Sequence, residues 1–196
     1  MMDIKAKTHD IVAGSLITAK GVHESLNATG KYVVECYDKD KNLKWVAESK
    51  NLVVNVGLQY MAGVALTSTA QITSWYVGLY GAGASNTPNA EDTMSSHAGW
   101  TENTTYSNAT RVAATFAAAT LPTSSGNPSV VTNSASKAQF DINGTTTIGG
   151  AFLTSGSAKG GTTGTLFSAA DFASPGDRSV VNGDILLVTY TFSLSA

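Results

Sequence analysis

The residues that come nearest to a catalytic arrangement in this chain surround one histidine. His97 has Asp92, Ser95, Ser96 and Glu102 within five positions on either side. A serine, a histidine and a carboxylate can perform nucleophilic catalysis when the fold aligns them as a triad. These serines lie in no Gly-x-Ser-x-Gly elbow, and serine is so frequent here that chance proximity is expected. We therefore predict a hydrogen-bonded loop histidine and no enzymatic activity.

Metal ligands are also poorly placed in the sequence. The three histidines lie far apart and Cys36 is the single cysteine, so no zinc-ligand spacing and no disulfide pair are present. Residues 38–42 (DKDKN) resemble the opening of a calcium loop, but Leu43 stands where that loop needs glycine and Ser49 where it needs glutamate. We predict a turn for this segment, and neither a metal nor another cofactor for the chain.

Charged residues are concentrated in the first 51 positions. Only 13% of the 196 residues are charged, against about 25% in an average soluble protein. After Asn51 there are seven acidic and four basic residues. A net charge of −2 favours neither nucleic acid nor an anionic membrane as partner, and no apolar run approaches the roughly 20 residues that span a bilayer. A surface so poor in charge suits a protein that works packed into an assembly.

The N-terminal part of the chain differs from the rest. The opening MMDIKAKTHD carries charges and no apolar core of a secretory signal, so we expect synthesis in the cytosol. Residues 1–30 show weak periodicity and are predicted to form an extended N-terminal arm, or alternatively a flexible terminus without a role. Residues 31–196 are predicted to form one domain. The arm contains two apolar pairs as candidate contact residues: Ile11, Val12, Leu16 and Ile17.

The first regular elements form a predicted β-hairpin. Residues 31–37 alternate between two faces, and a second β-prone run follows at 43–47. The polar segment 38–42 joins the two runs. Cys36 falls within the first strand, where we expect a small buried side chain rather than a reactive thiol.

One helix is predicted in the chain. Apolar residues recur at helical spacing between positions 56 and 66, and Asn55 precedes them as a potential N-cap. Gly57 and Gly63 weaken this helix, each by about 1 kcal/mol relative to alanine. We expect it to be short and to pack on a sheet.

The remaining sequence predicts short strands separated by turns. Residues 74–80 (SWYVGLY) are apolar on both faces, which predicts a central strand. Residues 91–106 are expected to form a long surface excursion, and residues 121–136 a turn region. The chain is therefore predicted to be mainly β, an antiparallel β-sandwich that is jelly-roll-like, with one short helix. Further strands are predicted at 111–116, 138–142, 146–153, 165–169 and 185–193.

Trp100, Tyr106 and Arg111 are the other candidate contact residues. Tryptophan, tyrosine and arginine are enriched at protein interfaces. The same residues could anchor a long loop on the sandwich. Trp100 and Tyr106, with Glu102 and Asn103, could also form an aromatic floor with polar edges for a sugar. We favour packing or an interface over sugar binding.

Several stretches of the sequence are similar to small structural proteins of tailed bacteriophages. They are GKYVVECYDKD from Gly30, NLVVNVGL from Asn51, WYVGL from Trp75, DTMSSHAGWTE from Asp92 and VNGDILLVTYT from Val181. The resemblance runs from about residue 30 to the end of the chain, and the family has no catalytic residues to transfer. It implies a virion component, found on the head as a decoration (cement) protein or in the tail.

Together with the composition, this resemblance predicts a capsid decoration protein on the surface of the virion. Its expected partners are the major capsid protein and further copies of itself, as a dimer or trimer. The arm would grip the lattice by adding a strand to an exposed sheet edge. The alternatives are a tail or neck component and a glycan-binding host-attachment module that uses the loop around Trp100.

Overall fold

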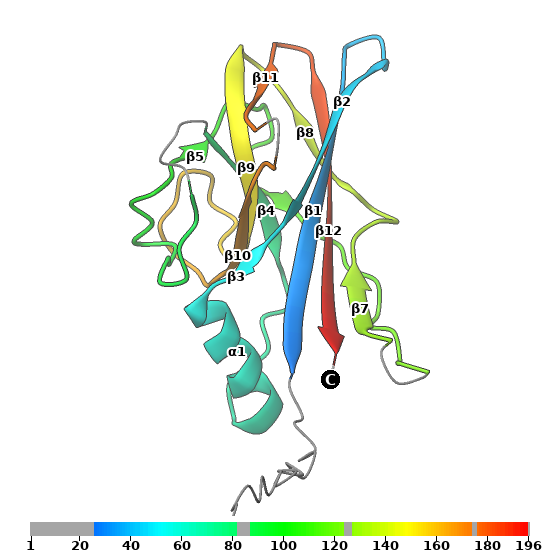
Figure 1. Ribbon diagram of the computed structural model, residues 1–196. Coiled ribbons are helices and arrows are strands. Elements are labelled where there is room, and N and C mark those ends of the chain that lie inside the picture. The colour runs from blue at the N-terminus through cyan, green and yellow to red at the C-terminus, as the bar shows by residue number, and fades with distance from the viewer. Residues whose placement is uncertain (1–25, 82–86, 124–126, 174–175, 196) are drawn as a thin grey trace, which may run out of the picture.

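The structure, a computed structural model, describes residues 26–81, 87–123, 127–173 and 176–195. Two antiparallel sheets pack face to face, and one helix lies at one end of them (Figure 1). The predicted fold class, a mainly antiparallel β-sandwich with one short helix, is confirmed. The first sheet has the order β2 (Leu43–Lys50), β1 (Asn27–Tyr37), β12 (Ile185–Ser195) and β7 (Ser129–Thr132), with β8 (Ala138–Asp141) also paired to β12.

The second sheet is built around β9 (Thr146–Thr154) and β4 (Tyr76–Gly81), which pair with each other along most of their length. The prediction that the strand near 74–80 is central is therefore confirmed. The sheet has the order β3 (Leu52–Val53), β10 (Leu166–Asp171), β9, β4 and β5 (Glu102–Asn103), with β11 (Arg178–Val180) paired to β9 and β6 (Val112–Ala113) paired to β4.

The pairing of β1 with β12 runs through the middle of the first sheet. Tyr32 lies opposite Tyr190, and Cys36 lies opposite Leu186. These side chains point into the sandwich and are buried, as the alternation in the sequence predicted. The hydroxyl of Ser168 on the second sheet lies 2.9 Å from the Tyr32 hydroxyl and donates to the Tyr190 hydroxyl at 3.2 Å. This buried polar contact joins the two sheets across the core.

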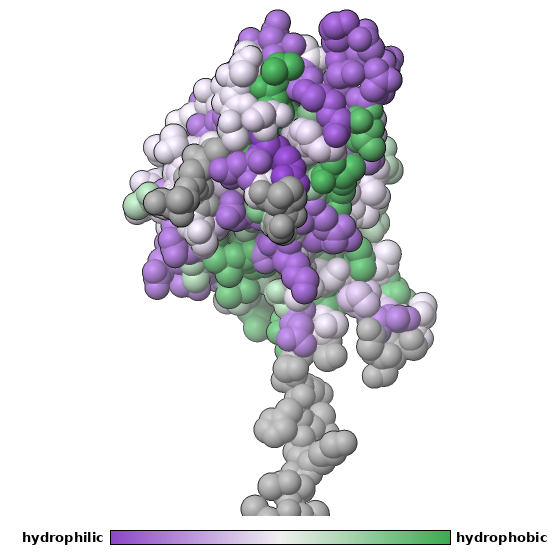
Figure 2. All heavy atoms as spheres, turned by 45° about the horizontal axis from the view of Figure 1, so that its top comes forward, coloured by the Kyte–Doolittle hydropathy of each residue, from purple (hydrophilic) through white to green (hydrophobic). Residues whose placement is uncertain are grey.

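The predicted hairpin of β1 and β2 is confirmed, and its turn is held by one carboxylate. Oδ1 of Asp38 accepts the backbone N–H groups of Asp40 and Asn42 at 2.9 and 2.8 Å. Hydrogen bonds from Asn42 also lower the pKa of Asp38. The segment is thus a turn closed by a side chain, as predicted. Figure 2 shows hydrophilic residues gathered over this hairpin end of the sandwich.

Several element boundaries differ from the prediction. β7 lies within residues 121–136, which were expected to be a turn region, because its outer edge pairs with the preceding segment through Thr120 and Val130. The strand predicted at 111–116 is reduced to β6. β1 begins at Asn27, inside the predicted arm 1–30, and residues 1–25 lie outside the described residues.

The second sheet has a core on both of its faces. One face packs against the first sheet. The other carries a separate buried cluster that includes Tyr80, Met94, Trp100 and Phe152. Met94 and Trp100 come from the stretch 91–106, which was predicted to be a surface excursion. That stretch instead covers the outer face of the sheet and is part of the folded core.

Candidate interaction surface

The helix α1 (Asn55–Leu66) exposes an unusual amount of apolar surface. It contains no charged residue, and Gly57 is its one buried residue. Leu58 is 43% exposed and Leu66 is 86% exposed. A helix that is apolar on all sides is normally buried in a protein or a membrane. Within the described part of the chain, α1 is therefore an apolar element that has packing partners on one side only.

The helix confirms the predicted element but not its predicted cap. Val54 is the N-cap residue, and no side chain caps the N-terminus. Asn55 is already helical, and its N–H donates to the backbone oxygen of Ala90 at 2.7 Å. The prediction of an Asn55 cap is wrong because the helix begins one residue earlier than expected, so the N-cap position falls on Val54, whose side chain has no acceptor.

Close backbone contact fixes α1 to the second sheet. A Cβ at Gly57 would lie 2.4 Å from the backbone oxygen of Phe167, so only glycine allows this approach. The hydroxyl of Tyr60 accepts the N–H of Ile72 at 2.8 Å, and its ring packs edge-on against Trp75. Trp75 in turn packs edge-on against Phe167. The buried side of the helix is thus well defined, although its other sides are open.

Replacing Gly57 with alanine is expected to destabilise the protein by about 1–3 kcal/mol, because the added methyl meets backbone that cannot move aside. On an exposed helix the same substitution would stabilise the protein by about 1 kcal/mol. The sign of the change in the free energy of unfolding therefore shows whether the helix contacts the sheet at this residue. Urea unfolding measures the effect. Gln59→Ala is the control, since Gln59 is exposed and its replacement is expected to stay within about 0.5 kcal/mol. A stabilised Gly57→Ala protein would show that the helix does not sit this close to the sheet.

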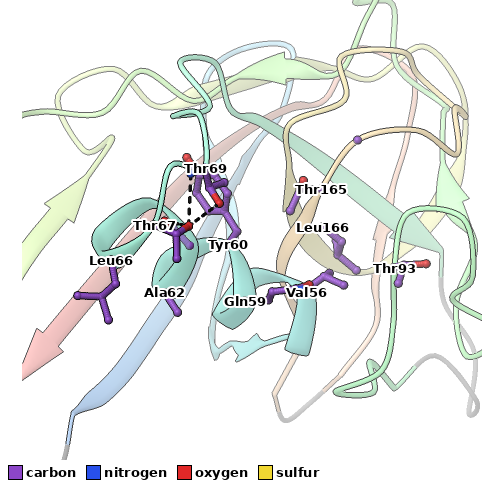
Figure 3. A pocket seen from close by; sticks show the side chains of 12 residues that line it. Val56, Gln59, Tyr60, Ala62, Leu66, Thr67, Thr69, Thr93, Thr165 and Leu166 are labelled. Atoms are coloured by element: carbon purple, nitrogen blue, oxygen red, sulfur yellow. Dashed lines mark hydrogen bonds between the residues drawn. The ribbon is translucent and has the colours of Figure 1, made fainter.

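Two hollows flank the helix. The larger, of about 760 Å³, lies between α1 and the start of β10 (Figure 3). Val56 and Leu166 line it from these two elements, and Leu66 lies at the far end of the helix. The described residues that line it include no histidine, cysteine or charged side chain, and their one titratable side chain is Tyr60. The Thr67 hydroxyl, at the rim of this hollow, already donates a hydrogen bond to the backbone oxygen of Gly63 at 2.7 Å.

The second hollow is a groove of about 370 Å³ on the other side of α1. We call it the apolar groove. Its walls come from α1, from the C-terminal part of β12 and from β7. It is lined by Tyr60, Met61, Val64, Ala65, Gln71, Ile72, Trp75, Phe116, Val131, Leu153, Phe167, Tyr190, Phe192 and Leu194.

The predicted contact residue Trp100 lies inside the fold. It is 3% exposed, and its Nε1 donates to Oδ2 of the buried Asp92 at 2.8 Å. His97 stacks on the Trp100 ring at 3.9 Å, and its Nδ1 lies 2.9 Å from the Trp100 backbone oxygen. His97 is therefore a hydrogen-bonded loop histidine, as predicted. Because the tryptophan ring is covered, it presents no stacking floor for a sugar.

Tyr106 and Arg111 are also buried. Arg111 forms an ion pair with Glu102, with Nη2 and Oε2 at 2.7 Å. Arg111 anchors its loop to the second sheet, and Tyr106 packs edge-on against Phe140 of β8 in the first sheet. Like Trp100, both are therefore packed in the fold, which is the packing alternative that the sequence left open. As an exposed contact surface the three residues do not fit this fold, because their side chains are already enclosed. The other candidate contact residues, Ile11, Val12, Leu16 and Ile17, lie outside the described residues.

The interaction surface was not predicted residue by residue. The sequence located α1 and placed Leu58 and Leu66 among the apolar positions of a helix that packs on a sheet, which is wrong for these two side chains because both are exposed. The available signal was that the helix carries no charged residue and offers few polar side chains, Asn55 and Gln59, for an outer face. Among the described residues there is no cluster of three or more His, Cys, Asp or Glu side chains that could hold a metal. None of the described helices is long and apolar enough to cross a membrane.

Comparison with protein-family models, with curated proteins and with solved structures finds no match for this chain.

Proposed function

We propose that this chain is a structural protein of a tailed-bacteriophage virion, a decoration protein that binds the major capsid lattice through the end of the sandwich that carries α1. The single observation that carries the proposal is the uncharged helix with exposed Leu58 and Leu66. An exposed apolar patch next to hollows is typical of a surface that another protein covers. The sequence resemblance to phage structural proteins supplies the class of partner.

The mechanism is stabilisation by binding. A subunit that binds the assembled shell more tightly than free capsid subunits shifts the equilibrium toward the shell by its binding free energy. Each lattice site adds a modest contribution, and many sites together make a large one. This mechanism requires no reactive side chain. The described buried charged groups are already held in ion pairs or hydrogen bonds, such as Arg111 with Glu102 and Asp184 with Lys44.

The glycan-binding alternative has less support. It requires an open aromatic face in the loop around Trp100, and that ring packs between His97 and the buried rings of Tyr80 and Phe152. A tail or neck location would use the same apolar surface on a different protein. Locating the chain in a cryo-EM map of the virion separates that alternative from a capsid position.

The test is binding to preformed shells of the major capsid protein of the same virus. The double variant Leu58→Glu/Leu66→Glu places two charges on the exposed side of α1. We expect its affinity for shells to fall roughly tenfold or more, because burying a leucine contributes about 1.5–3 kcal/mol and each 1.4 kcal/mol is a factor of ten. Co-sedimentation across a concentration series measures the change.

The matched control is Leu43→Glu/Val181→Glu. These residues are 55% and 44% exposed, and Leu43 lies at the hairpin end of the sandwich, opposite α1 (Figure 1). The control carries the same charge change on a comparable apolar exposure. Both variants should keep the thermal unfolding midpoint of the wild type. Equal shell binding by the two double variants, at wild-type affinity, would contradict the proposal.

A further inference from the structure

The apolar groove is suited to an uncharged peptide segment. Met61, Val64 and Ala65 of α1 form one wall, and Phe192 and Leu194 of β12 form the other. No charged side chain is among the described residues that line it. The hydroxyls of its two tyrosines already take part in hydrogen bonds, with the backbone N–H of residue 72 and with the side chains of residues 51 and 168. An occupant therefore gains from apolar contact and finds little that would recognise a charge.

The N-terminal part of the chain joins the sandwich at the rim of this groove. Ala28 pairs with Leu194, and Gly30 pairs with Phe192, and both partners line the groove. Leu26, the first described residue, is 72% exposed. Residues 1–25 are therefore attached within a few residues of the groove wall.

The sequence of this N-terminal part contains a matching segment. Residues 11–17 (IVAGSLI) are uncharged and carry both apolar pairs, and they stand between Asp10 and the later Lys20. Residues 18–25 connect them to Leu26. An extended chain covers about 3.5 Å per residue, so this connection spans up to about 30 Å. That reach is sufficient for the groove of a neighbouring molecule whose own helix end faces the first.

We infer that the apolar groove binds residues 11–17 of a second copy of this chain, so that two copies exchange their N-terminal segments. β1 begins at the helix end of the sandwich, beside the groove. The connection 18–25 is also long enough to reach the groove of its own chain, and the crosslinking below distinguishes that case from exchange. Reciprocal exchange about a two-fold axis fills both grooves and closes the assembly at two chains.

This assignment goes beyond the proposed function and gives the arm a different receptor from the capsid edge expected from the sequence. It also leaves Leu66 outside the groove, since that residue lines the opposite hollow. One side of α1 thus holds the second copy, and the other remains open to a further partner. The tests below use purified full-length protein without shells, so their outcome is independent of capsid binding.

The first test is thiol crosslinking between two single-site variants, Ile17→Cys and Val64→Cys, mixed in equal amounts and treated with a short bis-maleimide. The native Cys36 can stay in place, because it is fully buried and burial raises its pKa to about 12. We expect a two-chain product that contains one of each variant. Ile17→Cys mixed with Leu43→Cys is the control, and it should give no product above the single-variant background.

A chain that carries both Ile17→Cys and Val64→Cys distinguishes exchange from self-occupancy. At a concentration where the wild type is dimeric, exchange yields mainly linked pairs of chains. A predominantly intramolecular link within one chain would overturn the inference, as would the absence of any specific link in the mixture.

The second test measures self-association by sedimentation equilibrium. Leu16→Asp/Ile17→Asp is expected to raise the dimer Kd at least roughly tenfold, because two apolar anchors are replaced by charges. These residues precede the sandwich, so the unfolding midpoint should not change when it is measured below the dimer Kd, where the wild type is also a single chain. Ala6→Asp/Thr8→Asp is the control, with the same added charge in the same arm but intact apolar pairs, and it should dimerise like the wild type. A wild type that remains a single chain at about 100 μM, or a double aspartate variant with unchanged Kd, would overturn the inference.

Discussion

Arg111→Ala is expected to lower the free energy of unfolding by about 3–5 kcal/mol, as breaking a buried ion pair does when one charge is left alone. Arg111 is 1% exposed, and its guanidinium donates to both carboxylate oxygens of Glu102 at 2.9 and 2.7 Å. It also donates to the backbone oxygens of Gly156 and Gly161 at 2.8 and 2.6 Å. The substitution therefore leaves the buried Glu102 carboxylate without its countercharge, holding only the Gly160 N–H among the described residues, and removes the donors to two backbone carbonyls.

Urea unfolding followed by circular dichroism measures this effect. Lys31→Ala is the matched control, because it breaks the Lys31–Glu48 ion pair, whose side chains are about half exposed. Such surface pairs contribute about 0–1 kcal/mol. The double variant Arg111→Met/Glu102→Leu, which removes both charges, should be more stable than Arg111→Ala. A loss below about 1 kcal/mol for Arg111→Ala would show that the pair does not hold the loop around residues 155–164.

Phe152→Ala is expected to destabilise the fold by a similar amount, about 3–5 kcal/mol, because it opens a cavity in the outer core of the second sheet. Phe152 is fully buried, and its ring centroid lies 4.9 Å from that of Trp100. The Arg111 guanidinium carbon lies 5.2 Å from the same centroid. Loss of the ring removes the surface on which the Trp100 loop packs. We therefore expect the tryptophan fluorescence of the folded protein to change and the unfolding midpoint to fall.

Gly78 provides the internal check on this prediction. A Cβ at Gly78 would lie 2.2 Å from Cζ of Phe152, so Gly78→Ala alone should cost about 1–3 kcal/mol through overpacking. In the Phe152→Ala protein the same methyl enters the vacated space, and its cost should disappear. The two substitutions are therefore expected to be strongly non-additive in a double-mutant cycle. Additive effects would mean that the phenylalanine ring does not fill the space above the glycine.

Elements with a clear two-residue period could be predicted from the sequence. β1 and β12 place alternate apolar residues such as Val34 and Val188 into the core, and their pairing follows this pattern. β4 was predicted as central because both of its faces are apolar. These predictions succeed because the alternation of apolar and polar residues along each strand determines which side chains are buried.

Features that depend on a distant partner could not be predicted. β7 forms in a Pro- and Ser-rich region because the segment around Thr120 supplies its outer hydrogen bonds. Trp100 was considered as an anchor of its loop, but its neighbours in sequence did not show that the loop folds back over the outer face of the second sheet. The exposed side of α1 is the same kind of case, because exposure depends on what the rest of the fold leaves uncovered.

The central pairing of β1 with β12 also sets the order of events during synthesis. Asn27 lies opposite Ser195, so on this side β1 has a partner that is more than 150 residues later in the sequence, while β2 pairs with its other side. The nascent chain must hold β1 unpaired on the β12 side until residues 185–195 have left the ribosome. Such non-local contacts slow folding, since the loop-closure entropy is lost before the contacts form. We expect the first sheet to close only after β12 has emerged, with the second sheet already able to form around β4, β9 and β10.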